Sequence, residues 1–221
     1  MIVDTMSLQE VGETILKTAT RNIPTVAKMI LRKEKVYKRV IYRGLKERYD
    51  FQPLLFTDDG IEFIICPFSL GKRDYKKYNM AIGLFAHVFY RGTNWYCLIT
   101  WDYSRVQMYC NHFFERYIER HLKDNSQVNV ETVRKYFKET DYLTLYRFVD
   151  NPKYENCVYA STKIGVCCGQ AISKNIVAYK TYIDMETLTQ GDKKTVFDKG
   201  QITFPKLIIN KLGLRAFKDV A

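Results

Sequence analysis

The sequence has no apolar run that approaches the 18 or so residues needed for a membrane-spanning helix. Its first residues, Met1–Met6, contain no basic flank followed by an apolar core, so no secretory signal peptide is expected. We therefore expect a cytoplasmic protein that has no membrane partner.

Cysteine is present, but not in the spacing of a metal site. The six cysteines form no Cys-x-x-Cys pair, and the three histidines add no zinc-like spacing. The sequence also lacks a glycine-rich phosphate loop, a nucleophile elbow and an acidic metal cluster. These absences speak against a metalloenzyme or a nucleotide hydrolase, and we expect neither a metal site nor a cofactor. Most of the cysteines lie in apolar runs, which suits a reducing compartment.

Apolar and aromatic residues are abundant. The 221 residues are 47% hydrophobic and 14% aromatic, which is the composition of a folded chain. Seventeen tyrosines and thirteen phenylalanines favour a β-rich core. The length suits one large domain or a core domain with an appendage.

Positive charge is concentrated near the N-terminus. The formal net charge is +11, and the stretch Lys28–Arg48 carries nine basic residues against two acidic ones. Such a balance favours a polyanionic partner, although a solvated helix face is the alternative interpretation. The nucleic-acid-binding residues predicted in this stretch are Lys28, Arg32, Lys35, Arg39 and Arg43.

A second basic segment covers residues 71–79 and reads as a polar loop with two tyrosines. Interleaved tyrosine and lysine suit base stacking combined with phosphate contact, while an ordinary surface loop is the alternative. The predicted nucleic-acid contacts in this segment are Lys72, Arg73 and Lys76.

The order of predicted elements indicates an α+β fold, in which helices pack on an antiparallel sheet behind a basic helical N-terminal region. The expected helices are 7–20, one from Ile23 onward, one from Asn111, and 129–139, with short ones at 185–188 and 205–212. The expected strands are 52–57, 61–70, 81–90, 95–101, 106–110, 158–161, 164–171 and 176–183. This divides the chain into a basic helical region (1–50), an α+β core (51–184) and a C-terminal helical extension (185–221).

The stretch Cys110–Leu122 carries the most specific functional pattern. With Asn111 as N-cap, the side chains of His112, Arg116 and Arg120 fall at i, i+4 and i+8 and form one stripe. An imidazole beside two guanidinium groups can hold a phosphate and move a proton next to it. The alternative is a surface stripe whose cations pair with Glu115 and Glu119. His121 falls on the opposite side of the helix, so we expect it to be structural.

A strand is followed by the His-xxx-Arg-xxx-Arg helix, a second helix, and a β-hairpin that ends in Tyr179-Lys180-Thr181-Tyr182. The order of these elements resembles that of the small RelE-superfold toxins of the BrnT type. The resemblance covers residues 95–184 at most. It implies metal-independent RNA cleavage, an antitoxin-like protein partner, and RNA rather than DNA as substrate. The catalytic residues it implies are His112, Arg116 and Arg120, with Lys180 or Tyr182 as the second proton-transfer group.

Two functions therefore remain open from the sequence. The first is an RNA-binding, metal-independent endoribonuclease that uses the His112 stripe. The second is a non-catalytic nucleic-acid-binding protein of a mobile element that uses Lys28–Arg48. A protein that is basic only for solubility is a third option.

Overall fold

The computed structural model describes residues 1–100, 102–142, 146–148 and 155–188. The helices in this part are α1 (Leu8–Arg21), α2 (Ile23–Arg43), α3 (Gly71–Tyr78), α4 (Asn111–Tyr117), the π-helical turn η1 (Ile118–Leu122) and α5 (Val130–Glu139). The strands are β1 (Tyr49–Asp50), β2 (Leu54–Asp58), β3 (Ile61–Ser69), β4 (Ala81–Tyr90), β5 (Thr93–Ile99), β6 (Val106–Cys110), β7 (Tyr146–Phe148), β8 (Cys157–Ser161), β9 (Gly165–Ser173) and β10 (Ile176–Asp184). The predicted α+β class is confirmed.

Local sequence signals account for the first two helices. The Ser7 side chain accepts a bond from the Glu10 N–H, and the Glu10 carboxylate accepts one from the Ser7 N–H, which completes a capping box. Pro24 lies in the first turn of α2, where a missing N–H costs nothing.

The strands form one ten-stranded sheet in the order β1-β3-β4-β5-β6-β10-β9-β8-β7, with β2 paired to β3. Every pairing is antiparallel except that of β6 with β10, which is parallel. The long connection that a parallel pair requires contains α4, η1, α5 and the strands β7, β8 and β9. The sheet runs without a break from the β2–β3 hairpin to β10, so the region that resembles the toxins shares its sheet with residues 49–94.

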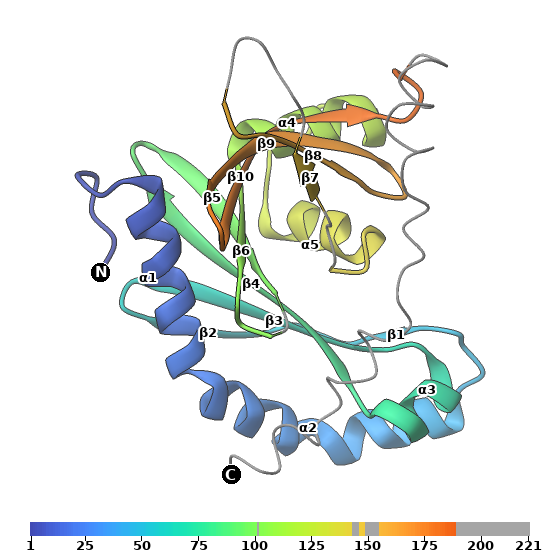
Figure 1. The fold of residues 1–221 in the computed structure, drawn as a ribbon. Coiled ribbons are helices and arrows are strands. Elements are labelled where there is room, and N and C mark those ends of the chain that lie inside the picture. The colour runs from blue at the N-terminus through green and yellow to red at the C-terminus, as the bar shows by residue number, and fades with distance from the viewer. Residues whose placement is uncertain (101, 143–145, 149–154, 189–221) are drawn as a thin grey trace.

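Helices cover both faces of this sheet (Figure 1). Successive residues of β3 alternate between two cores: Phe63 packs on the α1–α2 side, and Ile64 packs on the α4–α5 side. A strand covered on both faces explains why β3 is a nearly continuous apolar run. The α4–α5 side holds a dense aromatic cluster in which Tyr109, Phe113 and Tyr136 lie within ring-contact distance of each other.

The predicted short helix at residues 185–188 is wrong. Residues 185–188, expected to be a short helix, form a turn after β10. The predicted helix at 205–212 lies outside the described residues, as does most of the predicted extension 185–221.

None of the described helices is long and apolar enough to cross a membrane. All six cysteines are free thiols, and four of them are buried.

Candidate nucleic-acid interface

The row of basic residues on α2 points away from the core. Successive residues of an α-helix are about 100° apart, and Val26, Ile30 and Ile41 mark the side of α2 that is buried against the sheet. On the same helical wheel, the predicted contacts fall in an arc of about 80° on the opposite side. These exposed residues are Lys28, Arg32, Lys35, Arg39 and Arg43. They span about 22 Å along the helix axis at 1.5 Å per residue.

The segment predicted as a loop at 71–79 is helix α3, which corrects the sequence interpretation. Gly71 has φ +88° and would place a Cβ 3.2 Å from the Glu47 carbonyl, so glycine suits the turn that leads into α3. Tyr75 is then buried and meets Tyr42 of α2 in a T-shaped contact, with ring centroids 5.9 Å apart. This tertiary contact between distant segments is absent from the local pattern, which contained only polar residues and tyrosines.

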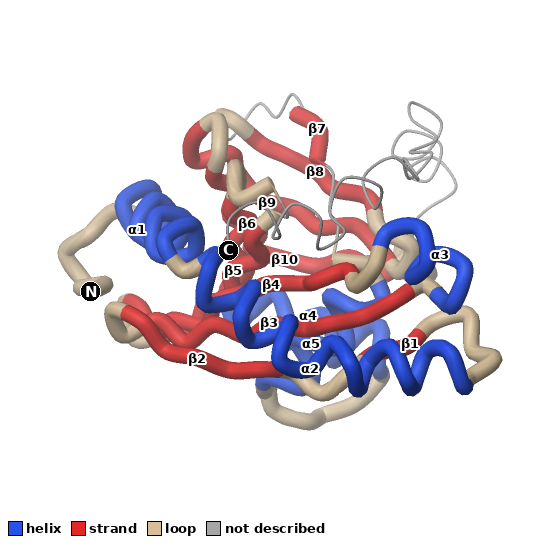
Figure 2. The backbone as a smooth tube through the Cα atoms, turned by 90° about the horizontal axis from the view of Figure 1, so that it is seen from below, coloured by secondary structure: helices blue, strands red, loops and turns tan. Residues whose placement is uncertain are grey.

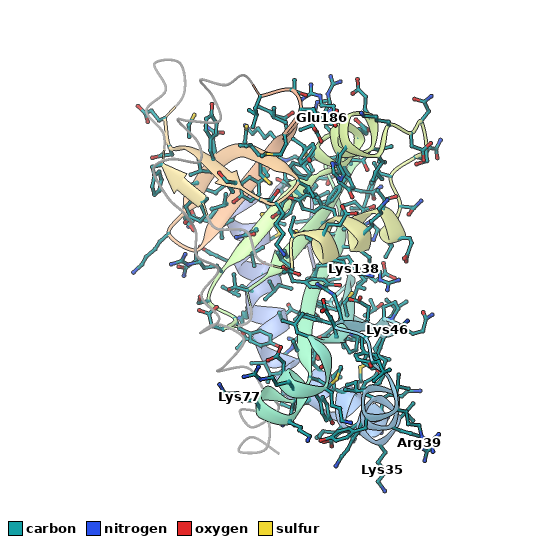
Figure 3. The ribbon with its side chains drawn as sticks, turned by 90° about the vertical axis from the view of Figure 1, so that its right-hand side faces the viewer. Lys35, Arg39, Lys46, Lys77, Lys138 and Glu186 are labelled. Atoms are coloured by element: carbon teal, nitrogen blue, oxygen red, sulfur yellow. The ribbon has the colours of Figure 1, made fainter. Side chains whose placement is uncertain are left out.

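Burying Tyr75 turns the basic residues of α3 outward. Helix α3 contacts α2 and lies at the same end of the molecule as the C-terminal turns of α2 (Figure 2). We define the basic surface as eight exposed residues of these two helices: Lys28, Arg32, Lys35, Arg39, Arg43, Lys72, Arg73 and Lys76. Lys35 and Arg39 project from α2 at the end of the molecule farthest from Glu186, and Lys77 of α3 lies at the same end (Figure 3).

The charges of the basic surface are not neutralised internally. Within the described part of the chain, none of its eight residues forms a salt bridge with a carboxylate. Lys72 donates to the Tyr42 carbonyl at 3.4 Å, and this contact leaves its positive charge in place. The surface therefore presents full positive charge to solvent, which is the requirement for phosphate contact.

The side chains of the His112 stripe have partners within the protein. Helix α4 begins at Asn111 with Cys110 at the N-cap position, so the predicted Asn111 cap is wrong. The Asn111 amide instead donates to Glu115 Oε1 at 2.7 Å. His112 is exposed, but its Nδ1 lies 3.1 Å from Glu115 Oε2, and its Nε2 accepts from Arg116 Nε at 3.4 Å. Both ring nitrogens are therefore occupied.

The two arginines of the stripe are also engaged. Arg116 Nη1 donates to Glu119 Oε2 at 2.5 Å, which is an i,i+3 ion pair. Arg120 lies in the π-helical turn η1, where the wider turn breaks the 3.6-residue register of the stripe. Its Nη1 donates to the Tyr182 carbonyl at 2.7 Å. That carbonyl belongs to the part of β10 that extends beyond the end of β6, so Arg120 satisfies a backbone acceptor on a free strand edge.

Residues two apart in a regular strand share a face, but Lys180 and Tyr182 do not. The pairing of β10 with β9 is irregular between Tyr179 and Thr181, and an extra residue in a strand shifts the direction of every side chain after it. Lys180 is exposed, and its ammonium group donates to Gln170 Oε1 at 2.8 Å.

Tyr182 points to the opposite side of the sheet and is fully buried in the aromatic cluster, where its hydroxyl donates to the Ile164 carbonyl. Burial raises the pKa of Tyr182 well above its usual value. Tyr182 is therefore out of reach of a substrate on the surface, which corrects its predicted catalytic role.

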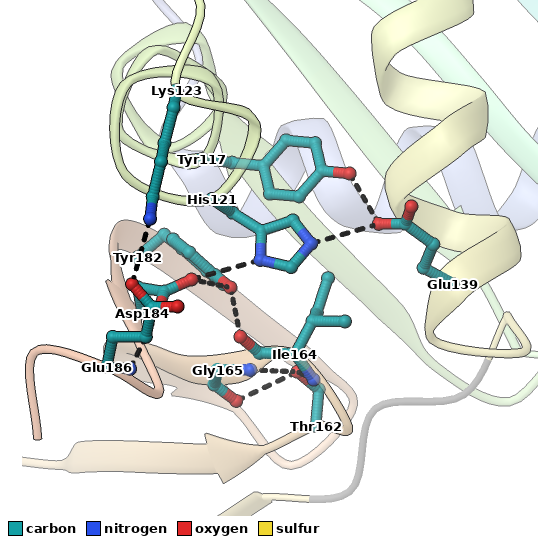
Figure 4. A network of polar contacts seen from close by, with 10 residues as sticks. All are labelled: Tyr117, His121, Lys123, Glu139, Thr162, Ile164, Gly165, Tyr182, Asp184 and Glu186. Carbon is teal, nitrogen blue, oxygen red and sulfur yellow. Dashed lines mark hydrogen bonds and ion pairs between the residues drawn. The ribbon is translucent and has the colours of Figure 1, made fainter.

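His121, expected to be structural, lies in a separate polar network (Figure 4). Its Nδ1 is 3.0 Å from Asp184 Oδ2, and its Nε2 is 3.6 Å from Glu139 Oε2. Glu139 also accepts from the Tyr117 hydroxyl at 2.6 Å; burial and this carboxylate raise the pKa of Tyr117. The imidazole thus connects η1 to α5 and to the end of β10.

A cavity of about 520 Å³ lies between α5 and the strands β1 and β3, and its lining includes Asp50, Glu131, Arg134 and Lys138. Lys138 pairs with Asp50, and Arg134 pairs with Glu131. The lining residues of the cavity therefore pair largely with one another, and the cavity lacks the positive excess of the basic surface.

The structure thus brings the eight predicted nucleic-acid contacts onto two neighbouring helices. The five predicted catalytic residues do not converge on one site: His112 contacts Arg116, Arg120 binds the Tyr182 carbonyl, and Lys180 binds Gln170. Tyr42 and Lys38 were not among the predicted nucleic-acid contacts, yet they lie on the flank of α2 that faces α3. The i,i+4 spacing of Lys38 and Tyr42 was a usable signal, because residues at that spacing are neighbours on a helix.

No family model matches this chain, and neither a curated protein nor a solved structure matches it. The resemblance to the RelE-superfold toxins therefore stays a prediction.

Proposed function

We propose that this protein binds nucleic acid through the phosphate backbone, using the basic surface of α2 and α3. The observation that supports this most is that eight exposed cations, from two segments distant in sequence, have no carboxylate partner in the part of the chain that the structure describes. Unpaired lysine and arginine release condensed counterions when they contact phosphates, and this release supplies most of the free energy of sequence-independent binding.

The geometry of the surface favours a polymer over a small anion. The contacts on α2 alone extend over about 22 Å, which exceeds the reach of a single phosphate group. RNA is the first polymer to test because the resemblance of residues 95–184 points to it. An antitoxin-like partner remains a prediction of the same resemblance, and a cytoplasmic location remains a prediction from the sequence.

The experiment replaces Lys28, Arg32, Lys35 and Arg39 together with glutamine. We expect the affinity for a fluorescein-labelled 20-nucleotide RNA, measured by anisotropy at low salt, to fall by roughly 100-fold or more because four phosphate contacts are lost. The matched control replaces four exposed cations elsewhere, namely Lys17, Arg105, Lys135 and Lys174, and has the same net charge. An equal loss in both variants would show that net charge, and not this surface, attracts the RNA.

Ribonuclease activity is a second proposal, supported by the exposed His112 beside Arg116. His112 Nε2 must first leave the Arg116 N–H before it can accept a proton from a ribose hydroxyl. The test is RNA cleavage in EDTA by the purified protein and by His112→Ala. Cleavage that is lost in this variant, while RNA affinity and thermal stability are retained, supports the proposal; cleavage that persists contradicts it.

A further inference from the structure

The basic surface is not purely cationic, because exposed apolar and aromatic side chains lie along both sides of the α2 row. Val36 and Val40 are 55% and 44% exposed and fall on one flank of the row. Tyr42 is 36% exposed and falls on the other flank, towards α3. A ligand with apolar surface next to its phosphates can contact these side chains and the cations of the row together.

Tyr42 has the surroundings of a stacking platform. Its ring is held by the T-shaped contact with the buried Tyr75, so its orientation is fixed from within the protein. The ammonium groups of Lys38 and Lys72 lie 5.9 and 5.4 Å from the ring centroid. Both side chains are long and exposed, and they can swing to phosphates while a base takes their place against the ring.

The form of the nucleic acid decides whether these groups are used. A duplex buries the faces of its bases and presents mainly phosphate, sugar and base edges, whereas a single strand offers an unstacked base face to every aromatic ring that it passes. A straight row about 22 Å long also suits a flexible strand, because the backbone of a duplex winds away from such a row within one helical turn.

We infer that the nucleic acid bound by the basic surface is single-stranded, with its phosphates along the α2 row and one base stacked on Tyr42. This inference rests on the proposed function and specifies its ligand. Electrostatics alone predicts the reverse preference, because each contact with a duplex releases more counterion than a contact with a single strand. A preference for single strands is therefore diagnostic of contacts with the bases.

The first test compares four labelled probes by anisotropy in one buffer: oligo(U), oligo(dT), an abasic strand of the same 20 phosphates, and a 20-base-pair duplex. We expect both base-containing single strands to bind roughly 10-fold more tightly than the abasic strand, and more tightly than the duplex. Equal affinity for the abasic strand, or tighter binding of the duplex, would overturn the inference.

The second test uses variants of Tyr42. We expect Tyr42→Leu, which keeps apolar bulk against Tyr75 but has no aromatic face, to weaken oligo(U) binding roughly 10-fold and to leave abasic-strand binding unchanged. Tyr42→Phe should bind like the unaltered protein, because it keeps the ring. The salt dependence should be the same in all three proteins, since no charge is removed. If Tyr42→Leu binds oligo(U) normally, the stacked base is excluded.

The proposed nucleic-acid binding and the single-strand inference fail in different ways. If no probe binds, or if the glutamine variant of the α2 row binds all probes normally, the proposed function itself is wrong. If the duplex binds best and the α2 row is required, nucleic-acid binding stands and only the single-strand inference falls.

Discussion

Helices α2 and α4 carry similar basic residues at similar spacing, yet the structure gives their charges different surroundings. On α2, the row Lys28–Arg43 contains a single acidic residue, Glu34, and its contacts remain unpaired among the described residues. On α4 and the following turn η1, Glu115 and Glu119 follow His112 and Arg116 by three residues and lie against them. The placement of carboxylates, and not the number of cations, separates an anion-binding surface from a self-paired helix.

The same comparison separates His112 of α4 from His121 of η1. His112 is exposed, and its carboxylate partner is itself half exposed, so their pairing has little energetic weight. His121 lies against Asp184, whose side chain is only 7% exposed. Loss of a partner is costly where the group left behind cannot reach water.

The largest effect is expected from His121→Ala. The change leaves the buried Asp184 carboxylate without its imidazole partner, and we expect the free energy of unfolding to fall by about 2 to 3 kcal/mol. Urea unfolding followed by circular dichroism measures it. His112→Ala is the matched control and should cost less than about 0.5 kcal/mol. Equal losses in the two variants would contradict the assigned difference in surroundings.

An acidic residue placed within the α2 row should make it resemble α4. Lys35→Glu puts a carboxylate three residues after Arg32, the spacing that pairs His112 with Glu115. We expect RNA affinity at low salt to fall roughly 10-fold, because one cation is lost and a second is paired. Lys17→Glu, on exposed α1 surface, is the control and should change affinity by less than about 2-fold. Similar losses in both would mean that position on the surface is unimportant.

The smallest effect is expected from the reverse change on α4. Glu115→Gln combined with Glu119→Gln releases His112 and Arg116 from their partners. We expect RNA affinity to rise only about 2- to 3-fold, since the freed stripe is short and Arg120 still holds the Tyr182 carbonyl. Anisotropy with the same RNA measures the change. A rise as large as the loss in Lys35→Glu would show that α4 is a second phosphate-binding site.

Features set by local chemistry were predictable from the sequence. Ser7 and Glu10 form a capping box at the start of α1, and that pairing is visible in the sequence. Asp59 and Gly60 have positive φ angles in the turn between β2 and β3, a conformation that Asp and Gly adopt readily. The eight residues predicted to contact nucleic acid are exposed and lie on helices, while their role stays a prediction.

Features set by tertiary contact were not predictable. Helix α3 depends on the burial of Tyr75 against α2, and the local pattern of residues 71–79 contains no sign of that partner. The strand irregularity after Tyr179 moved Tyr182 to the opposite face, and the π-helical turn displaced Arg120 from its stripe. A single extra residue in a strand or helix turn changes which side chains meet, and periodicity alone does not reveal it.

The salt dependence of RNA binding tests the central claim most directly. For a single strand, each neutralised phosphate contributes about 0.7 to the slope of log affinity against log salt concentration. The glutamine variant of Lys28, Arg32, Lys35 and Arg39 should therefore have a slope smaller by roughly 2 to 3, while the variant of Lys17, Arg105, Lys135 and Lys174 keeps the original slope. Identical slopes in the unaltered protein and the α2 variant would contradict phosphate binding by this surface.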